Sequence, residues 1–307
     1  GNIYNNIEKK MYANGKGLKY LHGVEVYLTA ALEPKQRDNY HTILIAKNFE
    51  GVKEINTLVD WSTQSDHMYY KPRITFDEFF NISDNVIKIS ACLASPLSKY
   101  PNFIGKLVDE KIVELEKNKE TEANRLYTEL NSEAARDQWI EDSTIIHNTS
   151  YEIYVEQCIE KSNNAFDLQI EEAKSELENA KIVYDKLMKT YDYYEIQPHV
   201  KSMDQIRYNK MLYEASKKYN KPLIAGTDTH SIDSYKAECR SILQKAKHIE
   251  FSNEDEFDLT YKSYDELVDM FKQQGSLPMN VVLEAIENTN RMADSVTDYE
   301  LDTAFKY

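Results

Sequence analysis

The sequence predicts a mixed α/β fold, and three observations support this prediction. Short apolar runs rich in β-branched residues alternate with helix-like stretches, an order typical of strand–helix–strand units in a largely parallel sheet or barrel. Glycine accounts for only 8 of the 307 residues, too few for an all-β fold with many tight turns. Hydrophobic residues make up 41% and charged residues 29% of the chain, a balance typical of a globular protein.

Five runs are predicted strands, and helices are expected between them. The strands are 24–28, 42–46, 86–91, 193–197 and 223–227. Between the second and third, apolar residues at helical spacing predict a helix; they are Val52, Ile55, Leu58 and Val59. Between the last two, a helix is expected from Ser202 to Tyr219. A capping-box pattern, Ser202 to Gln205, opens it and Pro222 follows its end.

The middle of the chain predicts a helical insertion. Apolar residues recur at alternating steps of four and three, which is a heptad seam. They are Phe166, Ile170, Ala173, Leu177, Ala180, Tyr184, Leu187 and Tyr191. We expect a helical hairpin over 102–191 whose seam packs within the hairpin; the alternative is a docking arm for a partner or a second copy.

The carboxy-terminal part, 233–307, predicts further helices. A second capping-box pattern, Ser263 to Glu266, precedes one apolar helical stretch. Pro278 opens another. We therefore expect one α/β body from 1–101 and 192–232, followed by a helical extension.

Charge and cysteine content limit the partners and the compartment. The 37 Lys and Arg residues are outnumbered by 52 Asp and Glu residues, so the formal net charge is −15. A free-standing nucleic-acid binder usually has the opposite sign, because it must replace counterions on phosphates. Three cysteines without close spacing argue against disulfides and favour a reducing cytoplasm. The sequence shows no apolar run long enough to predict a membrane span.

Asp228 and His230 are the first candidates for a metal site. They follow a predicted parallel strand, at the end of the sheet where ligands normally bind. Residues two apart in extended chain share a face, so both heads can reach one ion. Imidazole and carboxylate suit Zn, Mn or Fe. The alternative is a local turn with a surface histidine.

Four more residues lie in or at the ends of predicted strands. Glu25 lies within an apolar strand, where a buried carboxylate needs a partner, unless the strand is at an edge and Glu25 faces water. His41 precedes a strand and is either a ligand or a surface residue. Cys92 follows a strand and is either a ligand or a small core residue. His199 follows another strand. His67 lies in a polar context, which predicts that it is an ordinary surface residue.

Seven segments carry a resemblance to a known family: 17–27, 40–48, 69–74, 90–94, 195–199, 222–230 and 285–289. Together they resemble the PHP (polymerase and histidinol phosphatase) domain of bacterial DNA polymerase III alpha subunits. The string Tyr69-Tyr70-Lys71-Pro72-Arg73-Ile74 resembles the polymerase branch of that family rather than the free phosphatases.

The resemblance implies a distorted (β/α)7 barrel with metal ligands at its carboxy-terminal mouth. By that resemblance the ligands are Glu25, His41, Cys92, Asp228 and His230, with His199 in a supporting position. The segment Gly1 to Tyr4 resembles the tail of a family motif, and the motifs before it are not in this sequence. The resemblance therefore implies an incomplete ligand set for a divalent ion, Zn or Mn.

The resemblance also implies a function and two alternatives. The main expectation is a fragment of a replicative DNA polymerase that supports the polymerase modules and retains a vestigial phosphoesterase site. Its partners would be those modules and other replisome proteins. The parent chain, rather than this acidic segment, would contact DNA and use Mg for nucleotide addition. The alternatives are a stand-alone metal-dependent phosphoesterase and a non-catalytic scaffold that binds a replication partner through the helical insertion.

Overall fold

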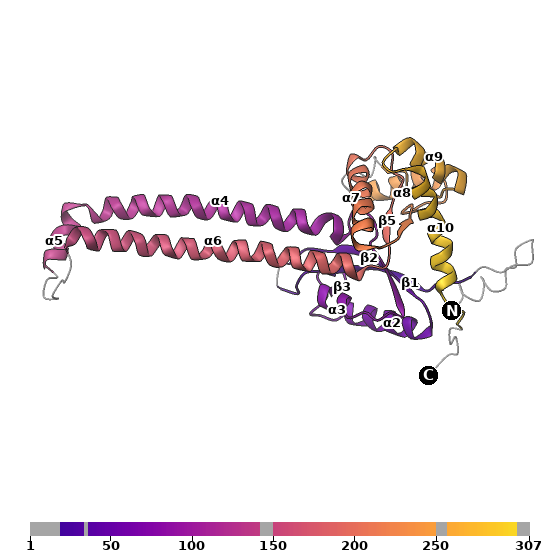
Figure 1. Cartoon of the computed structure of the whole chain (residues 1–307), viewed down its shortest axis with the longest axis horizontal. Coiled ribbons are helices and arrows are strands. Elements are labelled where there is room, and N and C mark those ends of the chain that lie inside the picture. The colour runs from indigo at the N-terminus through magenta and orange to yellow at the C-terminus, as the bar shows by residue number, and fades with distance from the viewer. Residues whose placement is uncertain (1–18, 34–35, 142–149, 250–256, 300–307) are drawn as a thin grey trace, which may run out of the picture. The chain divides into compact units, whose positions relative to one another are not determined.

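The computed structural model describes residues 19–33, 36–141, 150–249 and 257–299. The chain divides into two compact units (Figure 1). The first comprises residues 1–99 and 186–307, and the second comprises residues 100–185. Gly1 to Tyr4, in which the amino-terminal family motif was expected to end, lie outside the described residues.

Unit 1 contains a four-stranded sheet with the order β3-β1-β2-β4. Its strands are β1 (Gly23–Thr29), β2 (Tyr40–Ala46), β3 (Arg73–Thr75) and β4 (Val86–Ile89). β1 pairs parallel to β3, but β2 is antiparallel to both β1 and β4. The prediction of a largely parallel sheet is therefore wrong for this half. The reason is the link over residues 30–39, which is shorter than the dozen or more residues that a parallel crossover needs.

The other described strands, β5 (Tyr194–Ile196) and β6 (Leu223–Ala225), form a parallel pair. A single parallel bridge, Ile89 to Tyr193, connects this pair to β4. All five predicted strand positions therefore lie next to one another in one series, β1-β2-β4-β5-β6, with β3 beyond β1. The described strands do not close into a barrel, so the structure supports a mixed α/β fold and not the more specific (β/α)7 barrel.

Six described helices of unit 1 accompany these strands. They are α2 (Phe49–Ser62), α3 (Phe76–Phe80), α7 (Met203–Tyr219), α8 (Ser234–Ala246), α9 (Tyr264–Gln274) and α10 (Met279–Ser295). The capping box predicted at Ser263 and Glu266 is present. At α7 only half of the predicted box forms: Ser202 accepts from the Gln205 amide, but the Gln205 side chain bonds Asn209 instead.

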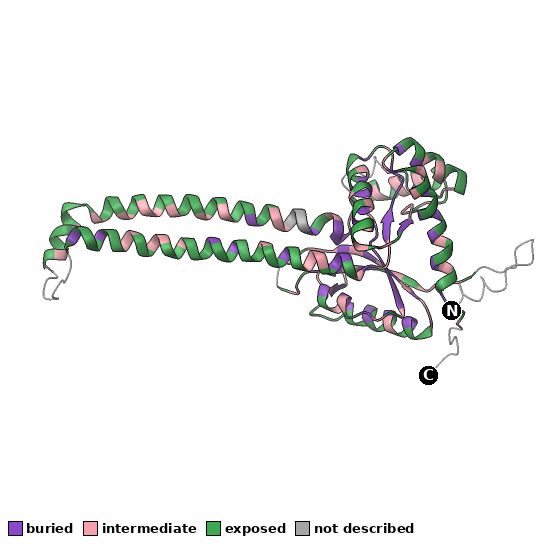
Figure 2. Ribbon diagram, viewed as in Figure 1, coloured by how far each residue is buried: buried purple, intermediate pink, exposed green. Residues whose placement is uncertain are grey.

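The core of unit 1 joins the strands to α10. One apolar cluster contains Ile87 and Ile89 of β4, Ile224 of β6, and Met292 and Val296 at the end of α10. Buried residues follow the strands in Figure 2. Asn288 of α10 donates a hydrogen bond to the Leu223 carbonyl at 2.7 Å. This contact satisfies a buried polar group and places α10 along β6.

Unit 2 is a helical hairpin. It contains most of α4 (Pro96–Leu130), α5 (Glu133–Glu141) and most of α6 (Tyr151–Thr190). α4 and α6 run side by side in opposite directions (Figure 1), as the ion pairs Lys111–Glu176 at 3.0 Å and Lys119–Asp167 at 2.5 Å also show. Such exposed pairs contribute little to stability.

The predicted heptad seam of α6 is confirmed as its less exposed face. Ile170, Ala173, Ala180 and Leu187 are buried, and the remaining seam residues are buried or half-buried. The stability of the hairpin therefore comes from an apolar seam rather than from its surface charges. None of the helices in the described part of the chain combines the length and apolar composition that a membrane span requires.

Candidate functional site

Glu25 and His41 form an ion pair on neighbouring strands. His41 of β2 lies directly opposite Tyr27 of β1, one side-chain step along the same face from Glu25. The Glu25 Oε1 and His41 Nδ1 atoms are 2.8 Å apart. The hydrogen bond from His41 lowers the pKa of the Glu25 carboxyl, against the opposing effect of burial. Glu25 is among the exposed residues, so the structure places it at the water-facing side of its strand.

Cys92 extends this pair. Its Sγ atom is 3.7 Å from His41 Nδ1 and accepts a hydrogen bond from the Ala94 amide at 3.5 Å. Burial, together with the charges of nearby carboxylates, raises the pKa of the Cys92 thiol to about 12. The thiol is therefore neutral at physiological pH. The thiolate is the form that attacks substrates and binds metals, so Cys92 would have to lose its proton to act as a ligand.

Asp228 and His230 lie on the loop that follows β6. The backbone at Asp228 has a left-handed conformation, with φ of 49°. The His230 Nδ1 atom is 2.6 Å from the Asp228 backbone oxygen and 3.8 Å from its carboxylate Oδ1. Burial raises the pKa of the Asp228 carboxyl, while His230 and His41 oppose that rise.

The five predicted ligands lie in one electrostatic neighbourhood. The charges of Glu25 and Asp228 both raise the pKa of the Cys92 thiol. The charges of Glu25, His41 and His230 all act on the Asp228 carboxyl. Segments from β1 and β2, and those that follow β4 and β6, therefore converge on one region.

Convergence does not, however, produce a metal-binding geometry. In the described ranges, no group of three or more His, Cys, Asp or Glu side chains is arranged to hold a metal ion. His41 Nδ1 is taken by Glu25, and His230 Nδ1 by a backbone oxygen. These contacts involve one ring nitrogen of each histidine, and the ligand assignment stays a prediction.

Glu195 is a site residue that the sequence reasoning missed. This carboxylate lies in β5, is buried, and accepts a hydrogen bond from Gln197 Nε2 at 2.7 Å. A Cβ atom on Gly226 of the neighbouring strand would lie 2.2 Å from Glu195 Oε1, so only glycine leaves room for this side chain. Burial raises the pKa of the Glu195 carboxyl to about 7, with the Asp228 and Glu25 charges adding to the rise. The pattern of glutamate in one apolar strand and glycine ending the next was the available signal.

His199 is connected to Glu195 through Gln197. The His199 Nε2 atom is 3.1 Å from Gln197 Oε1, and Gln274 donates to the His199 carbonyl at 3.0 Å. His199 is 1% exposed, and burial lowers the pKa of its imidazole to about 4. Its supporting position relative to the five predicted ligands stays a prediction, because its contact is with the side chain that orients Glu195.

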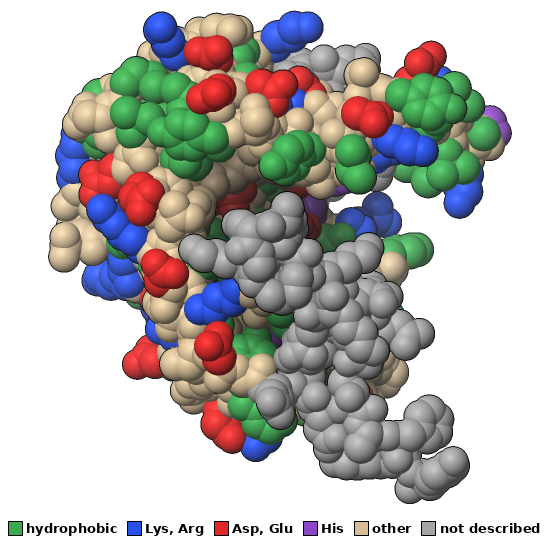
Figure 3. Space-filling model, turned by 90° about the vertical axis from the view of Figure 1, so that its right-hand side faces the viewer, with side chains coloured by type: hydrophobic (Ala, Val, Ile, Leu, Met, Phe, Trp, Pro, Cys, Tyr) green, Lys and Arg blue, Asp and Glu red, His purple; other side chains and the backbone are tan. Residues whose placement is uncertain are grey.

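Lys71 brings a positive charge to the same region. Its ammonium nitrogen lies 4.3 Å from the centre of the Tyr27 ring, and that ring meets His41 edge-on with centroids 5.0 Å apart. The Lys71 charge lowers the pKa of Glu25. On the face drawn in Figure 3, acidic side chains alternate with Lys and Arg, so the coloured part of this face shows no continuous basic surface.

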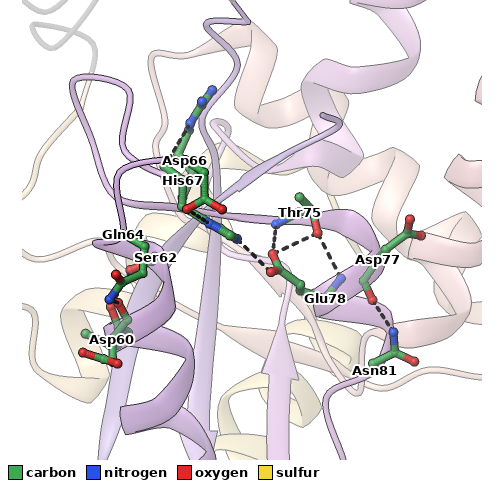
Figure 4. Close-up of polar contacts among 11 residues, drawn as sticks. Asp60, Ser62, Gln64, Asp66, His67, Thr75, Asp77, Glu78 and Asn81 are labelled. Atoms are coloured by element: carbon green, nitrogen blue, oxygen red, sulfur yellow. Dashed lines mark hydrogen bonds and ion pairs between the residues drawn. The ribbon is translucent and has the colours of Figure 1, made fainter. Parts of the chain in front are cut away.

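The interpretation of His67 as an ordinary surface residue is wrong. Its Nδ1 atom lies 2.9 Å from Asp66 Oδ1 and its Nε2 atom 2.8 Å from Glu78 Oε1, with the side chain 12% exposed. Figure 4 shows the imidazole between these two carboxylates. Glu78 also closes the capping box with Thr75 that begins α3. His67 therefore ties the segment before β3 to the start of α3.

Comparisons with known proteins agree with this α/β unit. A family model described as PHP domain matches residues 1–138. The chain is 25% identical to the DNA polymerase III subunit alpha of Borreliella burgdorferi over 316 residues, which cover 98% of this chain and 20% of that protein. It is 24% identical to the corresponding subunit of Aquifex aeolicus over 48% of this chain and 13% of that protein.

A third relative gives the same result over a shorter range. The DNA polymerase III subunit alpha of Chlamydia pneumoniae is 29% identical over 104 residues, which cover 32% of this chain and 8% of that protein. The chain spans a fifth or less of the length of these relatives. The resemblance expected from the seven sequence segments is confirmed: residues 1–138 match the PHP domain model, and the chain is similar to DNA polymerase III alpha subunits.

Proposed function

We propose that this PHP domain belongs to a replicative DNA polymerase III alpha subunit, where it supports the polymerase modules and retains an incomplete phosphoesterase site. The observation that carries the proposal is the alignment of 98% of this chain with 20% of one polymerase subunit. DNA synthesis, its Mg requirement and the contacts with DNA and replisome proteins would belong to the rest of such a chain. The sparse cysteines suit the reducing cytoplasm in which that chain would work.

The geometry of the five side chains supports the proposal that the phosphoesterase site is incomplete. A working metal site would polarise a phosphate and lower the pKa of bound water toward about 7. Glu25, His41, Cys92, Asp228 and His230 are the residues we assign to the remnant of such a site. Here Glu25 contacts Nδ1 of His41, and a backbone oxygen contacts Nδ1 of His230. In the described residues no three His, Cys, Asp or Glu side chains are grouped as ligands of one ion, an observation that supports the proposal.

A phosphatase assay separates this proposal from a stand-alone phosphoesterase. The chain is incubated with Mn or Zn and an aryl phosphate, next to the His230→Ala variant. We expect no turnover above that of the variant. Turnover that the substitution abolishes would contradict the proposal and favour an active phosphoesterase.

The supporting role needs a second test in the longer polymerase chain. We expect His230→Ala to leave primer extension unchanged, because no step of DNA synthesis passes through this site. Deleting the PHP domain should abolish extension by removing the support. If His230→Ala and the deletion reduce extension equally, the site acts in synthesis and the proposed division of roles fails.

A further inference from the structure

Helix α8 presents its apolar side to solvent. Four exposed residues of α8 recur at steps of four, three and four, which is a single helical stripe, and one exposed isoleucine lies just before the helix and another just after it. We call them the outward stripe: Ile232, Tyr235, Cys239, Ile242, Ala246 and Ile249. All six are exposed, and Ile232 and Ile242 are 77% and 61% exposed. Leu243 flanks the stripe and is 55% exposed.

The opposite side of α8 is the one that the rest of unit 1 covers. Ala237, Arg240, Ser241 and Gln244 are half-buried, and α8 contains no fully buried residue. The helix therefore turns small and polar residues inward and large apolar residues outward. A surface helix in a globular protein normally does the reverse, because burial of the apolar stripe is what holds it in place.

This inversion separates α8 from the neighbouring helices. In α10, Val282, Ala285, Ile286 and Met292 are buried, and in α9 Phe271 is buried. α8 is well formed at its start, where Asp233 caps the Lys236 amide at 2.8 Å. Contiguous exposed apolar surface of this kind marks an interaction site. A stripe at helical spacing fits a partner helix or an apolar groove.

We propose that the outward stripe is the surface on which the polymerase modules of the same chain dock. The inference rests on the proposed function and names the place where the support is exerted. The occupant is inferred from the length of the related polymerase subunit. This chain aligns almost completely with one-fifth of that subunit, so four-fifths of such a subunit lie outside the aligned region. α8 also begins just after Asp228 and His230, so docking there brings a partner next to the candidate site.

Cys239 provides a direct test, because it lies within the stripe and is exposed. Its rate of alkylation by iodoacetamide is measured by mass spectrometry in the PHP domain alone and in the full polymerase chain. We expect the alkylation rate to fall at least about tenfold in the full chain, because a covered thiol reacts only when the structure opens locally. Cys158, in unit 2, is the internal reference and should react at the same rate in both.

Two variants control the measurement. Glu238→Cys in a Cys239→Ser background places the thiol on the exposed flank beside the stripe, and its rate should change much less. Ile242→Glu should restore fast labelling of Cys239 in the full chain. The same substitution should leave the melting temperature of the domain alone unchanged, because Ile242 contacts mainly solvent.

Each result decides for or against the stripe. Equal rates of Cys239 labelling in the domain and in a full chain that extends primers would overturn the docking inference and leave the proposed function intact. Protection in the domain alone that disappears on dilution would assign the stripe to a second copy and also overturn it. A full chain that protects Cys239 but does not extend primers would refute the proposed function while supporting the docking surface.

Discussion

Replacing Glu195 by glutamine should remove a large part of the pH dependence of folding. Burial raises the pKa of this carboxyl from 4.5 to about 7 in the folded protein. Between these values the unfolded chain has released the proton and the folded protein still holds it. Stability is therefore lost as the pH rises from about 4.5 through about 7. With about 1.4 kcal/mol for each pKa unit, the loss amounts to about 3 kcal/mol.

Urea denaturation of the wild type and of Glu195→Gln at pH 5 and pH 8 measures this loss. The variant keeps the shape of the side chain and the acceptor for Gln197, but it does not titrate. From pH 5 to pH 8, we expect the free energy of unfolding of the wild type to fall by about 2–3 kcal/mol more than that of the variant.

The exposed Glu156 supplies the matched control. Glu156→Gln should change the free energy of unfolding by the same small amount at both pH values. Parallel pH profiles for the wild type and Glu195→Gln would refute the reasoning, because they would show that Glu195 is ionised in the folded protein across this range.

Two further substitutions test the polar contacts of unit 1. The two carboxylates beside His67 outweigh burial and raise the pKa of its imidazole above 6.5. His67→Gln should therefore lower the free energy of unfolding by about 1–2 kcal/mol in urea denaturation near pH 6. The loss should become smaller as the pH rises through the raised pKa of His67. An equal loss at every pH would contradict a charged His67 between the two carboxylates. Tyr191→Phe leaves the buried Thr42 hydroxyl without the Tyr191 hydroxyl that lies 2.6 Å away. The free energy of unfolding, measured by heat or urea, should fall by about 1–2 kcal/mol. Tyr127→Phe, at an exposed position, is the control and should cause no measurable change.

The positions of strands and helices could be predicted because they depend on local chemistry. The β-branched run at 42–46 lies in β2, the run at 223–227 begins with β6, and the Ser263 capping box begins α9 where the pattern places it. The heptad spacing predicted the buried seam of α6. In each case the relevant interactions are among residues only a few positions apart.

The candidate site could be predicted in part. The motif segments led to Glu25 and His41, which the structure brings together, but not to Glu195, whose burial depends on Gly226 of another strand. His67 was misinterpreted for the same reason, since Glu78 reaches it from α3. A pKa depends on which charges and how much solvent surround a group, and these come from distant parts of the chain.

The sequence by itself determined which face of each helix is apolar; only the tertiary structure decided which of those faces is covered. In α6 and α10 the apolar stripe is buried, whereas in α8 a stripe of the same spacing faces solvent. Periodicity is a property of one element, but burial requires a second surface placed against it. For the same reason the resemblance pointed to five side chains, and only their packing decided that Glu25 contacts Nδ1 of His41 and that a backbone oxygen contacts Nδ1 of His230.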